Sequence, residues 1–467
     1  MTHVRVLSQA PRVVGSPEMV STANYLVETL RTYGLDAEIQ ESPSAKGTLH
    51  NVIARIPGRD PSRALLILTH PDSVSFGAGD NASGVAVLLE TARALQTGAQ
   101  PRSDIILLFD DGEEEDYLGG YAFAQSHPWM KEIQCVIGLD TAAWGPVVLV
   151  QTTLGNGNLV RFYASSVPDP AAFGFFADAV TLSQTETEIK PFNERDLPGL
   201  ELEDPTAFSG KHSADDSIEH VRPGSMQQMG EQTLALARSF GDRYRAQAFV
   251  GDLSYFTLWP IGVIHYPVYW NILLVSLAGI GLVILIGVGI KRKAIIGRTI
   301  ALSFTSLLLV ILLAGLAGLG SNALFSLLFP SPNPSVSKYL NLASLPFLLL
   351  DLIAVILIYL AIRKRLVGRW GASVVSLGGM LIWLLFAVVL LAALPVGNYI
   401  LSIPLLVAVL AHFLPEKWKI AALIPAAIAT ILFAPNLVLT FLGTGMVMLA
   451  LVNILVILNV ELWAAGR

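Results

Sequence analysis

The feature that most constrains this chain is a series of long apolar runs in its C-terminal half. From Trp270 onward, runs close to the roughly 20 residues that a membrane-spanning helix needs recur between short polar breaks. The sequence predicts seven transmembrane helices, with six or eight left open because the fifth run is short and the last two are barely separated. The expected spans are 270–290, 299–320, 342–362, 371–394, 398–414, 420–440 and 444–464. We therefore expect a multi-pass integral membrane protein with the lipid bilayer as one partner.

Charge divides the chain at nearly the same place. Residues 1–255 carry 18 Lys and Arg against 33 Asp and Glu, whereas residues 256–467 carry 12 against 3. An acidic half of this kind argues against nucleic acid as a partner. It is long enough to bury a full core, and we expect the chemistry there.

Three parts are expected on this basis: a domain over residues 1–250, an interfacial linker over 251–269 and a transmembrane domain over 270–467. The linker contains prolines that prevent it from spanning a membrane. It is also rich in aromatic residues, which prefer the lipid headgroup region.

Basic residues fall in alternate breaks between the apolar runs. They occur at 291–298, 363–369 and 417–419, and the chain ends at Arg467, whereas the other breaks hold only Lys338. Because positively charged loops stay in the cytoplasm, the sequence predicts a cytoplasmic C-terminus and an extracytoplasmic N-terminal domain.

The start of the chain does not by itself explain export. Residues 1–10 contain neither the apolar core of a signal peptide nor a membrane helix. Either the first predicted helix exports everything before it, or a leading helix is missing, and we favour the second. The single N-x-S/T sequon, at Asn81, gives no sign of a eukaryotic lumen, so a prokaryotic cell membrane is the expected location.

The N-terminal half alternates strand-like and helix-like segments. Apolar runs at 64–69, 105–109, 136–139 and 147–150 are typical of strands, and 83–95, 117–126 and 223–239 are typical of helices. This alternation predicts an α/β sandwich with a central mixed sheet flanked by helices. The whole chain is then an α/β domain followed by an all-α transmembrane bundle.

Histidines and carboxylates gather where the predicted strands and loops meet. The set is His70, Asp72, Asp80, Glu113, Glu114, Asp140 and His212. Strand ends are where α/β sheets place their ligand sites. Two histidines with three or more carboxylates could hold two divalent metals about 3.5–4 Å apart.

Each of these residues also has an ordinary structural explanation. His70 alone would more often be a hydrogen-bonded histidine, and Asp80 could be only the N-cap of a helix. Glu113 and Glu114 belong to an acidic run, which is usually a solvated turn. The joint occurrence of the set, in order and at successive junctions, favours a metal site.

This ordered set resembles the zinc-dependent M28 peptidases, which include bacterial aminopeptidases. The family motifs H-x-D, D-[DN]-x-x-G, G-E-E, L-D and H-x-x-x-D have counterparts that begin at His70, Asp80, Gly112, Leu139 and His212. The similarity covers about residues 8–240.

A closer resemblance is to the membrane-embedded branch of that family, the vacuolar membrane and endoplasmic-reticulum metallopeptidases. That branch also places a peptidase domain before many helices. The chain departs from it at Gly138, where Asn is frequent, and at Lys211, where Tyr is common.

The resemblance implies two zinc ions per chain. Asp80 would bridge them, with His70 and Asp140 completing one site and Glu114 and His212 the other. Carboxylates and neutral imidazoles are zinc ligands, and three protein ligands per ion leave room for water and substrate.

The resemblance also assigns two supporting roles. Asp72 would accept the second ring N–H of His70 and fix its tautomer, with Asp216 in a similar part near His212. Glu113 would be the general base, passing a proton from water to the leaving amine.

The expected function is that of a membrane-anchored di-zinc exopeptidase, most simply an aminopeptidase acting on peptides. Three alternatives remain open: an inactive peptidase-like binding or trafficking module, a glutaminyl cyclase-type activity, and a transporter with a peptidase appendage. The transporter is the least favoured, because the predicted bundle has few of the ionisable groups that mark transport paths. The sequence does not indicate the oligomeric state.

Overall fold

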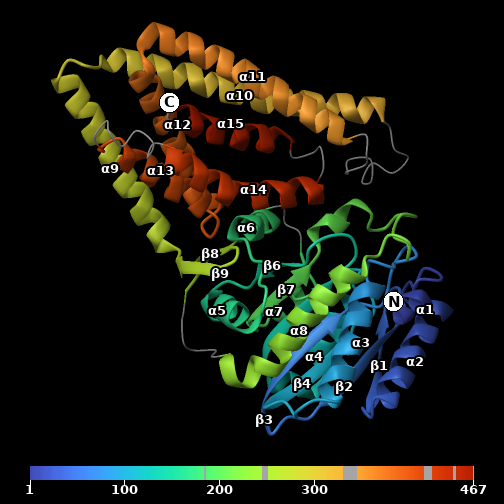
Figure 1. Cartoon of the computed structure of the whole chain (residues 1–467). Helices are drawn as coiled ribbons and strands as arrows, with labels where there is room; N and C mark the ends of the chain where they lie inside the picture. Colours follow the sequence, from blue (N-terminus) through green and yellow to red (C-terminus); the bar gives the residue numbers. More distant parts are fainter. Residues whose placement is uncertain (183–185, 245–250, 330–343, 415–422, 445–448, 466–467) are drawn as a thin grey trace. The chain divides into compact units, whose positions relative to one another are not determined.

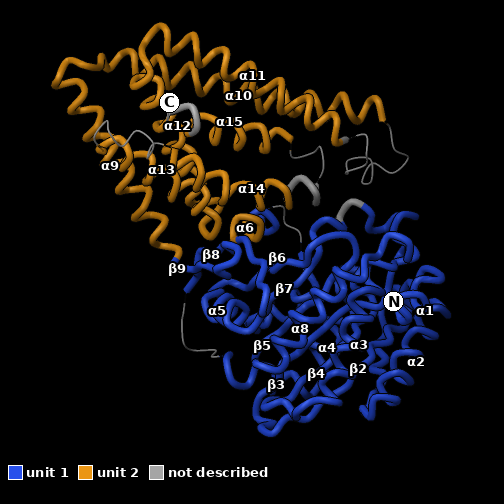
Figure 2. Tube along the Cα trace, viewed as in Figure 1, with its two compact units in different colours: residues 1–173, 179–267 blue, residues 174–178, 268–467 orange. Residues whose placement is uncertain are grey.

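The computed structural model describes residues 1–182, 186–244, 251–329, 344–414, 423–444 and 449–465 (Figure 1). The chain forms two compact units (Figure 2). The first comprises Met1–Phe173 and Ala179–Pro267, and the second comprises Gly174–Asp178 and Val268–Arg467.

The first unit is built on a mixed sheet of seven strands in the described residues. In spatial order they are β1 (Ala37–Ser44), β2 (Gly47–Ile56), β4 (Ser103–Phe109), β3 (Asp60–Thr69), β5 (Ile133–Asp140), β7 (Gly199–Glu203) and β6 (Val148–Thr152). The central strands β4, β3, β5 and β7 are parallel, whereas β1, β2 and β6 pair antiparallel. The predicted α/β class with a mixed sheet is confirmed.

Strands β3, β4 and β5 contain continuous apolar runs, as expected for strands that helices cover on both faces. On one face, Phe123 and Phe192 pack against Leu66, Leu68 and the neighbouring strands. These aromatic residues belong to α4 (Leu118–Ser126) and α7 (Lys190–Asn193). On the other face, α3 (Ala82–Gln96) and α8 (Pro223–Arg243) pack against each other and against β3.

Shorter elements complete the first unit. They are α1 (Thr2–Leu7), α2 (Pro17–Thr32), α5 (Gly157–Ser166) and two 3₁₀ turns at Pro128–Lys131 and Pro205–Ser209. Helix α6 (Gly174–Leu182) is divided, with Gly174–Asp178 assigned to the second unit. The segment expected as an interfacial linker contains a hairpin of β8 (Leu253–Leu258) and β9 (Gly262–Pro267), which clusters with the first unit. Trp259 and Ile261 at its turn are 82% and 70% exposed.

The second unit contains seven apolar helices in the described residues. They are α9 (Tyr269–Lys291), α10 (Gly297–Leu328), α11 (Ser344–Trp370), α12 (Ala372–Ala393), α13 (Tyr399–Ala411), α14 (Ile424–Thr444) and α15 (Leu449–Ala465). Four helices of the described chain, α9 to α12, are long and apolar enough to cross a bilayer. The chain is therefore an integral membrane protein.

The third predicted helix is longer than expected. The sequence placed its end at residue 362, with Arg363 in a loop, but α11 continues to Trp370 and ends before Gly371, whose φ is 87°. Arg363 lies inside this helix, with its Nε 2.9 Å from Glu461 Oε2 of α15. An ion pair between two helices satisfies charges that are costly in a membrane.

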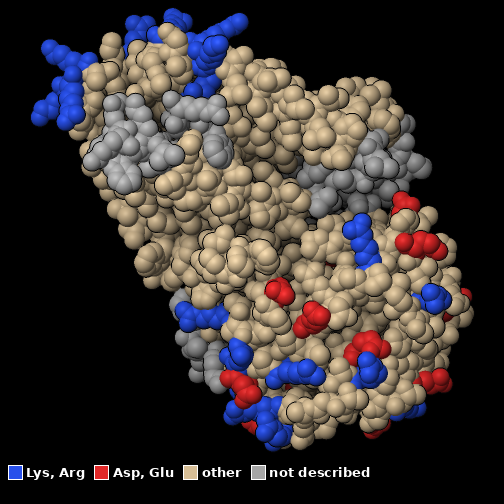
Figure 3. All heavy atoms as spheres, viewed as in Figure 1, with Lys and Arg blue, Asp and Glu red and all other residues tan. Residues whose placement is uncertain are grey.

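Lysine and arginine side chains gather at one end of the second unit, and the rest of its visible surface is almost free of them (Figure 3). The exposed members are Lys291, Arg292, Lys293, Arg298, Lys364, Arg365 and Arg369. Lys338, Lys417, Lys419 and Arg467, which also entered the topology prediction, lie outside the described residues.

Candidate metal centre

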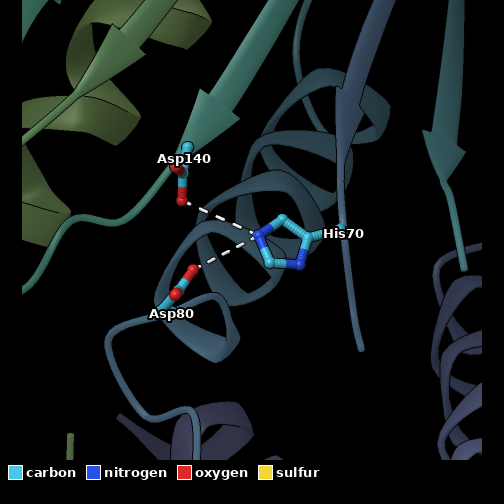
Figure 4. Close-up of side chains that lie close together, drawn as sticks. All are labelled: His70, Asp80 and Asp140. Atoms are coloured by element: carbon cyan, nitrogen blue, oxygen red, sulfur yellow. Dashed lines mark ion pairs between the residues drawn. The ribbon is translucent and has the colours of Figure 1, made fainter. Parts of the chain in front are cut away.

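His70, Asp80 and Asp140 meet at the edge of the sheet where β3 and β5 end. His70 follows β3, Asp140 is the last residue of β5, and Asp80 lies in the loop before α3. Their side chains point toward one another (Figure 4). His70 Nε2 is 3.3 Å from Asp80 Oδ1 and 3.7 Å from Asp140 Oδ1.

A second group forms around the other oxygen of Asp80. His212 Nε2 is 3.1 Å from Asp80 Oδ2 and 2.8 Å from Glu114 Oε2. In each group, one candidate ligand atom per residue lies within 4.8 Å of the others. Zinc–nitrogen and zinc–oxygen bonds are about 2.0–2.2 Å long, so each group has the donor types and spacing to surround one ion. Asp80 offers one oxygen to each.

The loop that carries Asp80 is held from two sides. Asp216 accepts hydrogen bonds from the backbone N–H groups of Gly79 (2.5 Å) and Asp80 (3.1 Å). Asp216 thus contacts the loop that carries Asp80. The buried guanidinium of Arg12 donates to the backbone oxygens of Phe76 and Gly77 on the same loop.

Asn81 ties this loop to the neighbouring strand end. Its Oδ1 caps α3 by accepting from the Gly84 N–H at 2.9 Å, and it also accepts from the Thr141 N–H at 3.1 Å. Its Nδ2 donates to the backbone oxygen of Leu139 at 2.8 Å. The buried Asn81 side chain therefore links the start of α3 to the end of β5.

Asp72 and the acidic turn are connected through the backbone. The carboxylate of Asp72 accepts from the N–H groups of Glu113 (3.2 Å) and Glu114 (3.1 Å). His70 Nδ1 lies 3.4 Å from Asp72 Oδ1 and 3.1 Å from the backbone oxygen of Asp72. With the proton on Nδ1, the lone pair of Nε2 is on the side of Asp80 and Asp140 and is free to bind a metal ion there.

Glu113 lies beside the first group. Its Oε2 is 3.8 Å from His70 Nε2. Burial raises the pKa of Glu113 well above its usual value; the charge on His70 opposes this rise, and nearby carboxylates such as Asp140 add to it. Glu113 therefore lies beside the first group among other carboxylates without belonging to either group.

Several residues beside the site have left-handed backbone conformations. The φ angles are 64° at Asp116, 62° at Tyr117, 43° at Thr141 and 61° at His212. Each of these residues is in, or directly follows, a segment that carries a candidate ligand or Glu113. Such conformations cost energy in residues other than glycine, and they concentrate at functional sites.

Sequence reasoning missed a group of buried charged residues behind the site. Glu201 and Glu203 of β7 are in register with Gly138 and Asp140 of β5. Glu188 Oε1 accepts from the His70 backbone N–H at 3.1 Å. Burial raises the pKa values of Glu188 and Glu201 well above the usual range.

The available sequence signal for this group was weak. Leu200-Glu201-Leu202-Glu203 alternates apolar and acidic residues, which normally indicates a strand with one face in solvent. In the structure all five residues of β7 are buried. The acidic face is buried because it points toward the candidate metal centre, and only the strand register reveals that.

Lys211 was noted only as a departure from the family pattern, yet its side chain reaches into the site. Its ammonium contacts Asp140 and lies 2.9 Å from Glu203 Oε1. Burial alone would lower the pKa of Lys211, but Asp140, Asp80 and Glu203 together raise it well above its usual value. Lys211 therefore places a basic side chain among the carboxylates of this centre.

Residues 51–237 match peptidase family M28. That range contains all seven residues of the predicted set and both groups at the sheet edge. The chain therefore carries an M28 peptidase domain, as the motifs predicted.

Among curated relatives, the vacuolar membrane protease of Candida albicans is 30% identical over 276 residues, which cover 55% of this chain and 32% of the relative. Human endoplasmic reticulum metallopeptidase 1 is 27% identical over 364 residues, or 66% of this chain and 39% of the relative. These proteins belong to the membrane-embedded branch that the sequence resembles. The chain spans about a third of the length of such relatives, and their eukaryotic sources give no support to the expected prokaryotic membrane.

Among solved structures, an aminopeptidase from Aneurinibacillus sp. strain AM-1 superimposes with a TM-score of 0.43 at 15% identity. The superposition covers 54% of this chain and 94% of that protein.

Proposed function

We propose that the chain is a membrane-anchored zinc exopeptidase that removes N-terminal residues from peptides. The observation that carries the proposal is the pair of ligand groups that share Asp80, one with His70 and Asp140 and the other with Glu114 and His212. A shared carboxylate between two such groups suits a pair of metal ions.

Zinc bound by these groups would polarise the scissile carbonyl and supply an activated water. Glu113 is the proposed acid–base group, because it is partly buried, adjacent to His70 and absent from both ligand groups. Its carboxylate takes the proton from the attacking water and returns it to the leaving amine.

Asp72 is proposed to act through position rather than through proton transfer. It accepts from the backbone N–H groups of both Glu113 and Glu114, so it sets the turn that separates the proposed base from the proposed ligand. It also borders the Nδ1 side of His70. A site held to this degree loses little entropy when substrate binds.

A substrate screen tests the proposal with the purified full chain. We expect hydrolysis of aminoacyl-4-nitroanilides and of peptides with a free N-terminus, and no cleavage of N-acetylated analogues. A chelator should abolish the activity, and zinc should restore it. Asp80→Asn should be inactive, whereas Asp36→Asn, at an exposed carboxylate in the same unit, should match the parent.

Three outcomes would each contradict the proposal and indicate a different function. Cleavage of N-blocked peptides from a free C-terminus would indicate a carboxypeptidase. Cyclisation of N-terminal glutamine without hydrolysis would indicate a glutaminyl cyclase. Bound zinc without any turnover across the screen would indicate a binding module.

A further inference from the structure

Lys211 is a largely buried lysine at the candidate metal centre, and its ammonium lies within 4 Å of three acidic residues. Its Nζ contacts Asp140 Oδ2, lies 2.9 Å from Glu203 Oε1 and lies 3.9 Å from Asp80 Oδ1. The side chain is 14% exposed. The lysine therefore belongs to the interior of the site and not to its solvent-facing rim.

The two oxygens of Asp140 have different neighbours. Oδ1 is 3.7 Å from His70 Nε2 and accepts from Thr141 Oγ1 at 2.8 Å. Oδ2 contacts the Lys211 ammonium instead. The carboxylate is thus oriented with one oxygen toward the proposed ligand group and the other toward the lysine.

The lysine is itself held in place. Glu203 is the register partner of Asp140 in the β5–β7 pair, so pairing of the two strands places both carboxylates beside the ammonium. The backbone N–H of Lys211 donates to the Ala207 oxygen at 3.1 Å. Lys211 also directly precedes His212, so one short segment supplies a proposed ligand of the second group and the contact to Asp140.

We propose that Lys211 is a positioning residue for the metal centre. Its ammonium holds Oδ2 of Asp140, so that Oδ1 is presented to a zinc ion together with His70 and Asp80. The inference rests on the proposed function, since it needs a metal in that group. Residues that orient metal ligands typically change metal affinity or activity by about 10–100-fold when replaced.

Repulsion between the ammonium and a zinc ion acts in the opposite direction. If repulsion dominated, removal of the lysine would tighten zinc binding. We expect orientation to dominate, because the ammonium is held between Asp140 and a second carboxyl group, Glu203, whose Oε1 lies 2.9 Å away. The sign of the change in zinc affinity therefore decides between the two effects.

Zinc affinity of purified full-length variants tests the proposal, measured by competition with a chromophoric chelator. In Lys211→Met, which keeps the length of the chain but removes the charge, we expect one bound zinc to weaken by about 10-fold or more. Lys211→Arg should recover most of the affinity, because a guanidinium can still donate to Asp140. Lys190→Met is the matched control: this lysine pairs with Glu186 at the surface of the same domain, and its loss should leave zinc affinity unchanged.

Unchanged or tighter zinc binding in Lys211→Met would overturn the positioning role. So would a rise in KM with unaltered zinc affinity, since it would show that the lysine contacts substrate. If Lys211→Met does not fold, as judged by circular dichroism, Lys211→Gln is held to the same criterion. A parent protein that binds no zinc would refute the proposed function, whereas normal zinc binding in parent and variant alike would refute this inference alone.

Discussion

Glu113 and Glu114 are neighbours in sequence but have different surroundings. Glu114 Oε2 faces His212, and Glu113 Oε2 faces His70 without joining either ligand group. The motif predicted both residues from sequence, because the acidic turn follows a strand. We propose that Glu113 is the base and Glu114 a metal ligand, and their different contacts support this assignment.

Replacing Glu113 tests the proposed base. Glu113→Gln keeps the shape of the side chain but cannot accept the proton, so we expect the rate to fall by about 100- to 10,000-fold while bound zinc is retained. Turnover with saturating substrate and elemental analysis of the same sample are the measurements. Glu115→Gln serves as the control, because Glu115 instead pairs with the exposed Lys46. Full activity in Glu113→Gln would refute the mechanism.

The site residues that the motifs predicted are placed by local sequence, whereas those that the motifs missed are placed by contacts between distant parts of the chain. His70, Asp80 and Asp140 follow apolar strands or open a helix, which local sequence reveals. Glu201 and Glu203 join the centre only through the pairing of β7 with β5, and Lys211 only through the loop that returns to it. Contacts of that kind depend on strand order, which the pattern of one sequence does not specify.

At the scale of elements, the buried strands and amphipathic helices were the most predictable. The expected strands at 64–69, 105–109 and 136–139 lie within β3, β4 and β5, because strands covered on both faces form continuous apolar runs. Strand β7 was not predicted as a buried strand, because its alternating leucines and glutamates are typical of a strand with one face in solvent. The β8–β9 hairpin was not predicted because its prolines and aromatic residues indicated an interfacial segment.

The β5–β7 contact makes a prediction about glycine. A methyl group at Gly138 would lie 2.1 Å from Glu201 Oε2, whose side chain is fully buried. We expect Gly138→Ala to destabilise the domain by about 1–3 kcal/mol, the usual cost of overpacking a core. The midpoint of thermal unfolding, followed by circular dichroism, measures the effect.

Gly230→Ala provides the control for that substitution. Gly230 lies in α8, and nothing would stand within 4 Å of an added methyl group. Alanine at such a helical position should be neutral or stabilising by about 0.5–1 kcal/mol. A Gly138→Ala variant as stable as the Gly230→Ala variant would show that Glu201 can move away without cost, and that its position is not fixed by the strand pairing.

At the scale of the whole molecule, the chain combines an M28 peptidase domain with a set of membrane helices. We propose that residues 1–250 form the peptidase domain and lie outside the cytoplasm, with 251–269 at the membrane surface and 270–467 in the bilayer. The exposed basic residues around Arg292, at one end of the second unit, favour this orientation.

Cysteine labelling of intact cells tests the orientation. The only native cysteine, Cys135, is fully buried and gives little background. We expect an impermeant maleimide to label Glu18→Cys, at an exposed position of the peptidase domain. Arg292→Cys should react only after the membrane is permeabilised, and labelling of Arg292→Cys but not Glu18→Cys would reverse the topology.

The most direct test of the account is the zinc content of the purified chain, because the central claim is that Asp80 joins two metal sites. Elemental analysis should find two zinc ions per chain in the parent and in Glu115→Gln. In Glu114→Gln, which removes a charged ligand from only one group, the content should fall toward one, together with activity. A parent without zinc, or a Glu114→Gln variant that keeps both ions, would contradict the shared-carboxylate centre.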